Sequence, residues 1–252
     1  MNITEIQQCA DFFRHNYLQT FYLLITYNGK SFILIGEKSN FPHLMGIPKN
    51  TYKSHGYNNP RTLFNDIINR NSIHTSIVPN HISTTSKMYK KALNFQKSTD
   101  LFWRNKGPLA IHYQPIFSKT KLNNVDVLLT DIMAGYMLGW VFHTRIPVNK
   151  DINIEKYCIC TWIDESGGTV QGKEKYMPGQ DVELIRYIFS FDSNSKLKSK
   201  KEYSYDYEQK KSILYSCERN NSNLLIDHIN SHFYIKIAIE NKIHCKINGM
   251  QY

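Results

Sequence analysis

The sequence lacks the features by which several common protein classes are recognised. Its five cysteines are odd in number and irregularly spaced, which argues against a disulfide framework and a four-ligand zinc site. No segment reaches the roughly 18 apolar residues that a membrane-spanning helix needs. The N-terminus also has no cationic region followed by an apolar run. We therefore expect a cytoplasmic protein that is not attached to a membrane.

Known phosphate-binding and metal-binding loops are also missing. The chain has no phosphate-loop, dinucleotide-fold or EF-hand pattern and no internal repeat. Cys158 and Cys160 are close enough to share one face of a strand, a spacing more typical of a small buried pair than of metal ligands. We expect neither a bound metal nor another cofactor.

Positive charge and apolar residues are both abundant. Lysine and arginine outnumber aspartate and glutamate by 31 to 21, and the net charge of +10 attracts polyanions such as nucleic acid. A lysine-rich and asparagine-rich composition also arises in AT-rich genomes, so charge alone does not assign a function. The apolar content of 41% is sufficient for a packed core. The composition therefore predicts a folded, basic protein.

Helical spacing is clearest in the N-terminal half. A first helix is predicted after Thr4 as N-cap, with one apolar stripe formed by Ile6, Cys9, Ala10, Phe13 and Tyr17. A second helix is predicted to begin at residues 59–60, where a proline in the first turn is tolerated. A third is predicted over residues 82–102, before the helix-breaking pair at 107–108.

Strand patterns alternate with turns through much of the chain. Residues 20–27 and 31–36 flank Asn28-Gly29, which predicts a type I′ hairpin. Further strands are predicted at residues 109–114, 125–131, 137–144, 157–164 and 182–191. Strands that follow helices predict an α+β fold, in which N-terminal helices pack on one face of an antiparallel β-sheet. We expect a main domain at 1–191, a polar linker at 192–201, and a C-terminal α/β appendage at 202–252.

The segment 40–47, Asn-Phe-Pro-His-Leu-Met-Gly-Ile, has a chemistry of its own. His43 lies between apolar neighbours, and Gly46 follows three residues later. This pattern indicates an imidazole at a turn that packs on the core while its polar edge stays reachable. Such a group exchanges protons near neutral pH. The alternative is a core histidine that only holds the turn in place.

The same segment resembles a motif of the phage-associated nuclease-like domains of the barnase, EndoU, colicin E5/D and RelE (BECR) group, in particular the fourth such family. The shared pattern is Phe, a spacer, His-Leu-x-Gly-Ile, then lysines and an amphipathic helix. Shorter similarities at 87–93, 125–129 and 138–141 extend the resemblance over about residues 3–164. It implies a BECR-like fold and a ribonuclease-like toxin or phage-defence effector. Met45 departs from the family's hydroxyl residue, and the last third has no recognised counterpart.

RNA cleavage without a metal needs a base near the ribose 2′-hydroxyl, an acid near the 5′-oxygen, and cations around the phosphate. The resemblance points to His43 for proton transfer, and we expect Lys49, Lys87 and His112 to complete the catalytic set. The expected nucleic-acid-binding residues are Lys53, His55, Lys90, Lys91, Arg104 and Thr161. The alternative interpretation of Arg104 is that it complements the helix dipole at the end of its helix. For the other binding residues and for Lys49, Lys87 and His112, solvated surface or strand packing is the alternative.

Two other functions stay open at this point. One is a non-catalytic module that holds RNA, DNA or an acidic protein such as an antitoxin or immunity partner. The other is a metal-dependent DNA-cleaving nuclease, which would need paired carboxylates beside a lysine. The available residues for such a site are Asp126, Asp131, Asp164, Glu165, Lys173 and Lys175. RNA, with tRNA among the candidates, is the substrate of the leading hypothesis.

Overall fold

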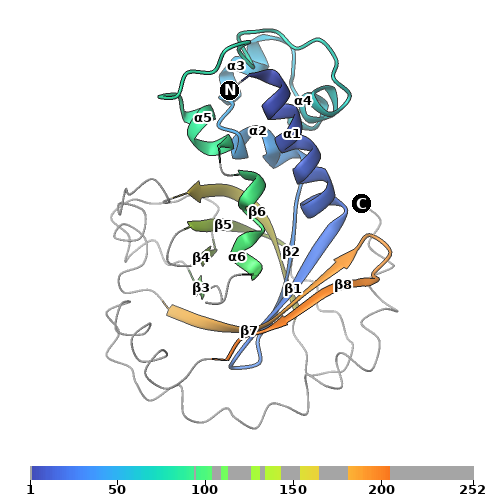
Figure 1. Ribbon diagram of the computed structural model, residues 1–252, viewed down its shortest axis with the longest axis vertical. Coiled ribbons are helices and arrows are strands. Elements are labelled where there is room, and N and C mark those ends of the chain that lie inside the picture. Colours follow the sequence, from blue (N-terminus) through green and yellow to red (C-terminus); the bar gives the residue numbers. More distant parts are fainter. Residues whose placement is uncertain are drawn as a thin grey trace.

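The fold is α+β, as the sequence predicts, with most of the helices gathered at one end of a β-sheet and α6 (Asp100–Trp103) beside its strands (Figure 1). A computed structural model describes residues 2–93, 95–103, 109–112, 126–130, 134–142, 154–164 and 181–204. None of the helices in these ranges has the length and hydropathy that crossing a bilayer requires.

The first helix, α1 (Ile3–Phe13), begins at a capping box. The Asn2 side chain accepts hydrogen bonds from the backbone N–H groups of Thr4 and Glu5, and the Glu5 carboxylate accepts one from the Asn2 N–H. The prediction of Thr4 as N-cap was wrong, because the Asn2 amide oxygen, two residues earlier, satisfies the free donors at the start of the helix. A π-helix, η1 (Arg14–Leu18), continues α1. The predicted apolar stripe is buried along its whole length.

The first hairpin joins β1 (Thr20–Thr26) to β2 (Ser31–Ile35) through a loop that differs from the prediction. Gly29 has φ +82°, whereas Asn28 does not adopt positive φ, so the turn is not type I′. The Thr26 carbonyl accepts from the Gly29 N–H at 3.1 Å, and the Thr26 N–H donates to the Lys30 carbonyl at 2.9 Å. The Thr26 hydroxyl also donates to the Asn28 side chain at 2.5 Å, which favours this three-residue loop.

Within the described residues, eight strands form one mixed sheet in the order β1-β2-β6-β5-β4-β3-β7-β8, and β1 also pairs with β7. The pairings from β1 to β7 therefore close a ring. The pairing of β2 with β6 is parallel, which corrects the prediction of a purely antiparallel sheet. Parallel neighbours need a long connection, and the helical region after β2 supplies it. The remaining strands are β3 (Leu109–His112), β4 (Val127–Thr130), β5 (Ala134–Phe142), β6 (Ile154–Asp164), β7 (Asp181–Asp192) and β8 (Leu197–Glu202).

The stretch 192–201 is not the linker that its polar composition predicts. Its second half lies in β8, which pairs antiparallel with residues 187–191 of β7. The Asp192 carboxylate accepts from the backbone N–H groups of Asn194 and Lys196, and Ser195 takes positive φ, so the first half is a tight turn. The predicted appendage lies outside the described residues after position 204.

The region between β2 and β3 consists of short helices. The predicted helix over 82–102 is divided, because Ser86 caps a new helix and Ser98 hydrogen-bonds the Tyr17 hydroxyl at 2.8 Å. Residues 49–54 also form a helix. The elements are η2 (Lys38–Asn40), α2 (Phe41–Leu44), α3 (Lys49–Ser54), α4 (Pro60–Ile68), α5 (Lys87–Ala92), η3 (Phe95–Lys97) and α6 (Asp100–Trp103).

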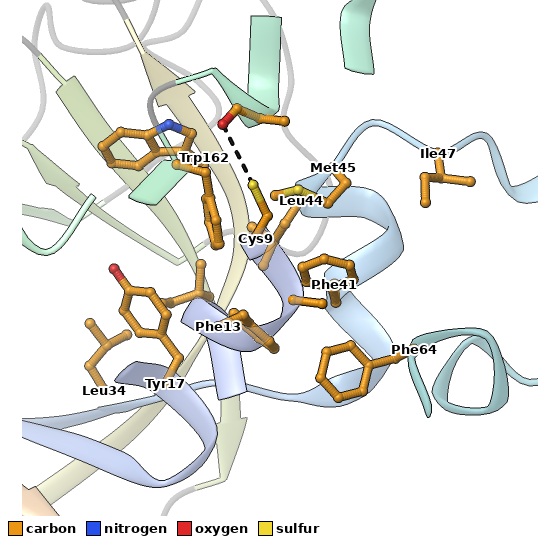
Figure 2. Close-up of a cluster of buried hydrophobic side chains, with 14 of the residues drawn as sticks. Cys9, Phe13, Tyr17, Leu34, Phe41, Leu44, Met45, Ile47, Phe64 and Trp162 are labelled. Atoms are coloured by element: carbon orange, nitrogen blue, oxygen red, sulfur yellow. Dashed lines mark hydrogen bonds between the residues drawn. The ribbon is translucent and has the colours of Figure 1, made fainter. Parts of the chain in front are cut away.

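A cluster of aromatic rings joins the helices into one core (Figure 2). The Phe13 ring of α1 lies 5.5 Å from Phe41 of α2 and 5.9 Å from Phe64 of α4, and Phe41 lies 5.2 Å from Phe64, measured between ring centroids. Full burial of one such side chain contributes about 1.5–3 kcal/mol. Packing of this size fixes α2, although it is only one turn long.

Candidate active site

His43 lies in α2, exposed between buried neighbours. Phe41, Leu44 and Met45 have no measurable exposure and anchor the helix to the core, while the imidazole stays accessible. The helix ends in a Schellman motif: the Ile47 N–H donates to the Pro42 carbonyl at 2.8 Å, and the Gly46 N–H donates to the His43 carbonyl at 3.0 Å. The sequence thus correctly places His43 at a turn that packs on the core.

The start of α2 is tied to the sheet by a side chain that the sequence analysis did not single out. The Asn40 amide donates to the Ile159 carbonyl at 3.0 Å and to the Cys158 sulfur at 3.1 Å, both in β6. A sequence signal for this contact is lacking because its partners lie more than a hundred residues away. The His43 turn therefore rests on a strand of the central sheet.

The lysine-bearing helix α5 is held in the same region. Ser86 caps its N-terminus by accepting from the Tyr89 N–H at 3.0 Å. Near its C-terminus, the Ala92 carbonyl accepts a weak hydrogen bond from the Cys9 thiol of α1 at 3.7 Å, drawn as a dashed line in Figure 2. Both α5 and α2 also contact β6. Shared supports in α1 and β6 thus bring the two helices together.

The structure places Lys87 and Lys91 of α5 beside His43. They are one helical turn apart, so their side chains leave the same face of α5. The Lys91 ammonium donates to the His43 backbone carbonyl at 3.3 Å. Lys87 is exposed, and Lys91 is partly buried. The His43 turn and two lysines of α5 therefore form one cluster, in which the charge of both lysines acts on the imidazole.

Burial and mutual repulsion change the protonation of this cluster. Partial burial, followed by the charges of Lys91 and Lys87, lowers the pKa of His43 below its ordinary value. Burial, followed by the charge of Lys87, lowers the pKa of Lys91 to about 8. At neutral pH the imidazole is therefore mostly neutral and able to accept a proton. Lys91 is still mostly charged but releases its proton more easily than an ordinary lysine.

The other lysines of the predicted site, and His55, are exposed to solvent. Lys49 and Lys53 lie one turn apart on α3, and Lys90 lies on α5. His55 follows α3 and stacks on His74, with ring centroids 4.0 Å apart. Among the described residues, hydrogen bonds and ion pairs do not connect these four side chains to His43, so their expected roles stay predictions.

The remaining predicted residues are described only in part. Arg104 lies outside the described residues. Thr161 is in β6, the strand that supports α2 and α5, and pairs with Met137. His112 ends β3, opposite Val127 and Asp181, and β4 and β5 separate that strand from β6 in the sheet order. Thr161 is therefore on the strand beneath the cluster, and His112 is on a more remote one.

The residues of the alternative, metal-dependent site are described only in part. Asp126 precedes β4 and Asp164 ends β6, whereas Asp131, Glu165, Lys173 and Lys175 lie outside the described residues. Within the described ranges, no three His, Cys, Asp or Glu side chains gather as a metal site. Burial raises the pKa of Cys9 to about 12 and also raises that of Cys158, which keeps both thiols protonated.

The fold and this cluster make a basic α+β domain in which a histidine lies beside two lysines. Among known families, the profile described as phage-Barnase-EndoU-ColicinE5/D-RelE like nuclease4 (PBECR4) matches residues 5–159. The chain belongs to this family, and the match includes α2, α5 and their support on β6. No curated protein and no solved structure matches the chain.

Proposed function

We propose that the protein is a metal-independent endoribonuclease that acts in the cytoplasm as a toxin or phage-defence effector. The observation that carries this proposal is the contact of His43 with the Lys87–Lys91 face of α5. A neutral imidazole beside two cations supplies a proton acceptor and phosphate-binding charge without a carboxylate. Membership of the PBECR4 family supports nuclease activity, and RNA is the substrate that this chemistry suits.

The proposed reaction uses the ribose 2′-hydroxyl as the nucleophile. His43 accepts its proton while the 2′-oxygen forms a bond to phosphorus and the bond from phosphorus to the 5′-oxygen breaks. The products are a 2′,3′-cyclic phosphate and a 5′-hydroxyl, whose proton comes from Lys91 or water. Lys87 and Lys91 stabilise the additional negative charge on the phosphoryl oxygens in the transition state. Lys49 and Lys53 are proposed to bind neighbouring phosphates.

The direct test is incubation of the purified protein with total tRNA, ribosomal RNA and plasmid DNA, each with and without excess EDTA. We expect cleavage of RNA that persists in EDTA and leaves cyclic phosphate ends. Cleavage that occurs only with Mg²⁺, or only of plasmid DNA, would overturn the proposal. The first result would redirect attention to the carboxylates at 126, 131 and 164–165.

A non-catalytic binding module is the second candidate. It is favoured by the hydrogen bonds to the His43 backbone carbonyl, which give this position a structural role that does not need the imidazole. In that case the Lys87–Lys91 face would hold RNA or an acidic antitoxin or immunity protein. Binding of tRNA without any cleavage would favour this function over the nuclease.

A further inference from the structure

The glycine that ends α2 also sets how closely α5 approaches. Gly46 adopts φ +72°, and a Cβ atom added to it would lie 3.3 Å from Lys87 Cγ, 3.3 Å from Lys91 Cδ and 3.4 Å from the Lys87 backbone carbon. These distances are shorter than ordinary van der Waals contact for a carbon atom. The aliphatic parts of both lysine side chains therefore pack directly on Gly46, in the space that a Cβ atom at position 46 would occupy.

The same two helices are connected a second time through Lys91. Its ammonium donates to the His43 carbonyl, which also accepts from the Gly46 N–H. Cations are favoured at the C-terminal end of a helix, where carbonyl groups lack helical partners. Lys91 thus crosses over Gly46 and caps α2 at the residue that carries the imidazole.

We infer that Gly46 and Lys91 form a joint that docks α5 on the His43 turn and sets the position of Lys87 relative to the imidazole. Lys91 is in this view a positioning residue as well as a cation. The inference rests on the proposed nuclease function for its catalytic consequence. Whether the joint exists is a separate structural question, which the titration of His43 tests without any measurement of cleavage.

The test compares two glycines that share a backbone conformation. Gly29 has φ +82° in the first hairpin, and a Cβ added there would meet nothing within 4 Å. Gly46→Ala and Gly29→Ala therefore impose similar backbone strain, but only the first pushes against α5. Gly46→Asn is a second variant, because asparagine tolerates positive φ and still adds the Cβ atom. It keeps the test usable if Gly46→Ala does not fold.

The first readout is NMR titration of the His43 imidazole, assigned by its loss in His43→Gln. With α5 displaced, we expect Gly46→Ala and Gly46→Asn to raise the pKa of His43 toward its ordinary value, while Gly29→Ala leaves it unchanged. Lys91→Met keeps most of the aliphatic stem and removes the charge, so it should also raise the pKa of His43. Lys91→Arg should retain most of the wild-type shift.

The second readout is the rate of tRNA cleavage in EDTA. A displacement of about 1 Å in a catalytic site can lower the rate about 100-fold, so we expect Gly46→Asn to cut tRNA about 10- to 100-fold more slowly than Gly29→Ala. Unchanged titration of His43 in folded Gly46→Ala and Gly46→Asn would overturn the joint. A shifted titration in a protein whose wild type cleaves no RNA would support the joint and refute the nuclease.

Discussion

Two lysine-rich segments of this protein, α5 and β8, use their charge in different ways. Lys91 and Lys87 of α5 lie beside His43, whose pKa is lowered first by burial and then by the charges of these two lysines. In β8, Lys198 donates to the Thr20 hydroxyl at 3.0 Å, and the Lys200 ammonium lies 5.6 Å from the centre of the Tyr187 ring. The chemical setting of a lysine run, and not its density in the sequence, therefore separates a candidate site from a structural contact.

The lysines of β8 have roles in stability that need no ligand. Lys200 also lies 5.8 Å from the Phe189 ring centre, and Lys201 donates to the Trp103 carbonyl while lying 5.2 Å from the Tyr203 ring centre. Cation–π contacts at such sites contribute about 0.5–1 kcal/mol each. Lysine side chains on an edge strand also disfavour its pairing with strands of other protein molecules. The comparison with α5 yields four predictions, ordered by the size of the expected effect.

The largest effect is expected from substitution of His43, the titratable residue that lies beside the lysines of α5. His43→Ala should lower RNA cleavage by about 10²- to 10⁴-fold, the range for loss of a general acid or base. His43→Gln should fold as well as the wild type and be equally impaired. Cleavage rates and melting temperatures of both variants are the measurement. A folded His43→Gln with nearly wild-type activity would end the catalytic assignment.

Removal of one lysine from each segment tests the comparison directly. Lys87→Gln should lower cleavage about 10- to 100-fold, because it removes a cation from the transition-state phosphate. Lys200→Gln, which carries the same change of charge on β8, should change the rate less than twofold. The measurement is single-turnover cleavage of tRNA in EDTA. Equal losses in the two variants would show that net charge alone governs activity.

The same pair of variants should differ in the salt dependence of RNA binding. Affinity of the inactive His43→Gln protein for single-stranded RNA should fall with salt, with a log–log slope of about −0.7 for each phosphate contacted. Adding Lys87→Gln should make this slope shallower by about 0.7, and adding Lys200→Gln should leave it unchanged. Fluorescence titrations at several salt concentrations give the slopes. A salt-independent affinity would contradict phosphate binding altogether.

The smallest effect is expected on stability, where loss of the Lys91 charge should make the protein more stable. Because the pKa of Lys91 is lowered to about 8, the unfolded chain binds a proton more tightly than the folded one. Folding is therefore penalised below pH 8, and the penalty disappears as the pH rises toward the ordinary lysine pKa. Lys91→Met should raise the melting temperature at pH 7 by about 2–4 °C.

The pH series of that prediction carries its own control. The gain in melting temperature from Lys91→Met should shrink between pH 8 and about pH 10. Lys90→Met, on the exposed side of α5, should give a small difference that does not depend on pH. A constant gain for Lys91→Met across the series would mean that burial does not disfavour its charge.

Local patterns in the sequence predicted most elements but misjudged several of their limits. The apolar stripe from Ile6 to Tyr17 and the strands around β3 to β7 follow from periodicity, which depends on near neighbours. The helix predicted over 82–102 was wrong because Ser98 bonds Tyr17 across the core, a partner that no local pattern contains. The prediction of a linker at 192–201 was wrong because the polar residues of β8 form backbone pairs with the neighbouring strand β7.

The candidate site divides in the same way. The sequence shows His43 at a turn with a glycine three residues later, and it gives Lys87 and Lys91 the spacing of one helical turn. The structure adds that this glycine, Gly46, has positive φ. The sequence does not show that α5 is the neighbour of His43, that Asn40 anchors the turn to β6, or that β3 with His112 lies farther away in the sheet. Those relations come from contacts between distant parts of the chain.

The sequence by itself determined which residue types are available for chemistry around His43 and much of the helical and strand pattern. Periodicity acts within a few residues, so it can be recognised without the fold, whereas the cap at Asn2 and the loop of the first hairpin were not predicted correctly. Only the tertiary structure decided that two lysines of α5 lie beside the His43 turn, and that β2 and β6 pair in parallel. Such choices depend on how the whole apolar core packs, because burial is shared among many distant side chains and favours no single pair in advance.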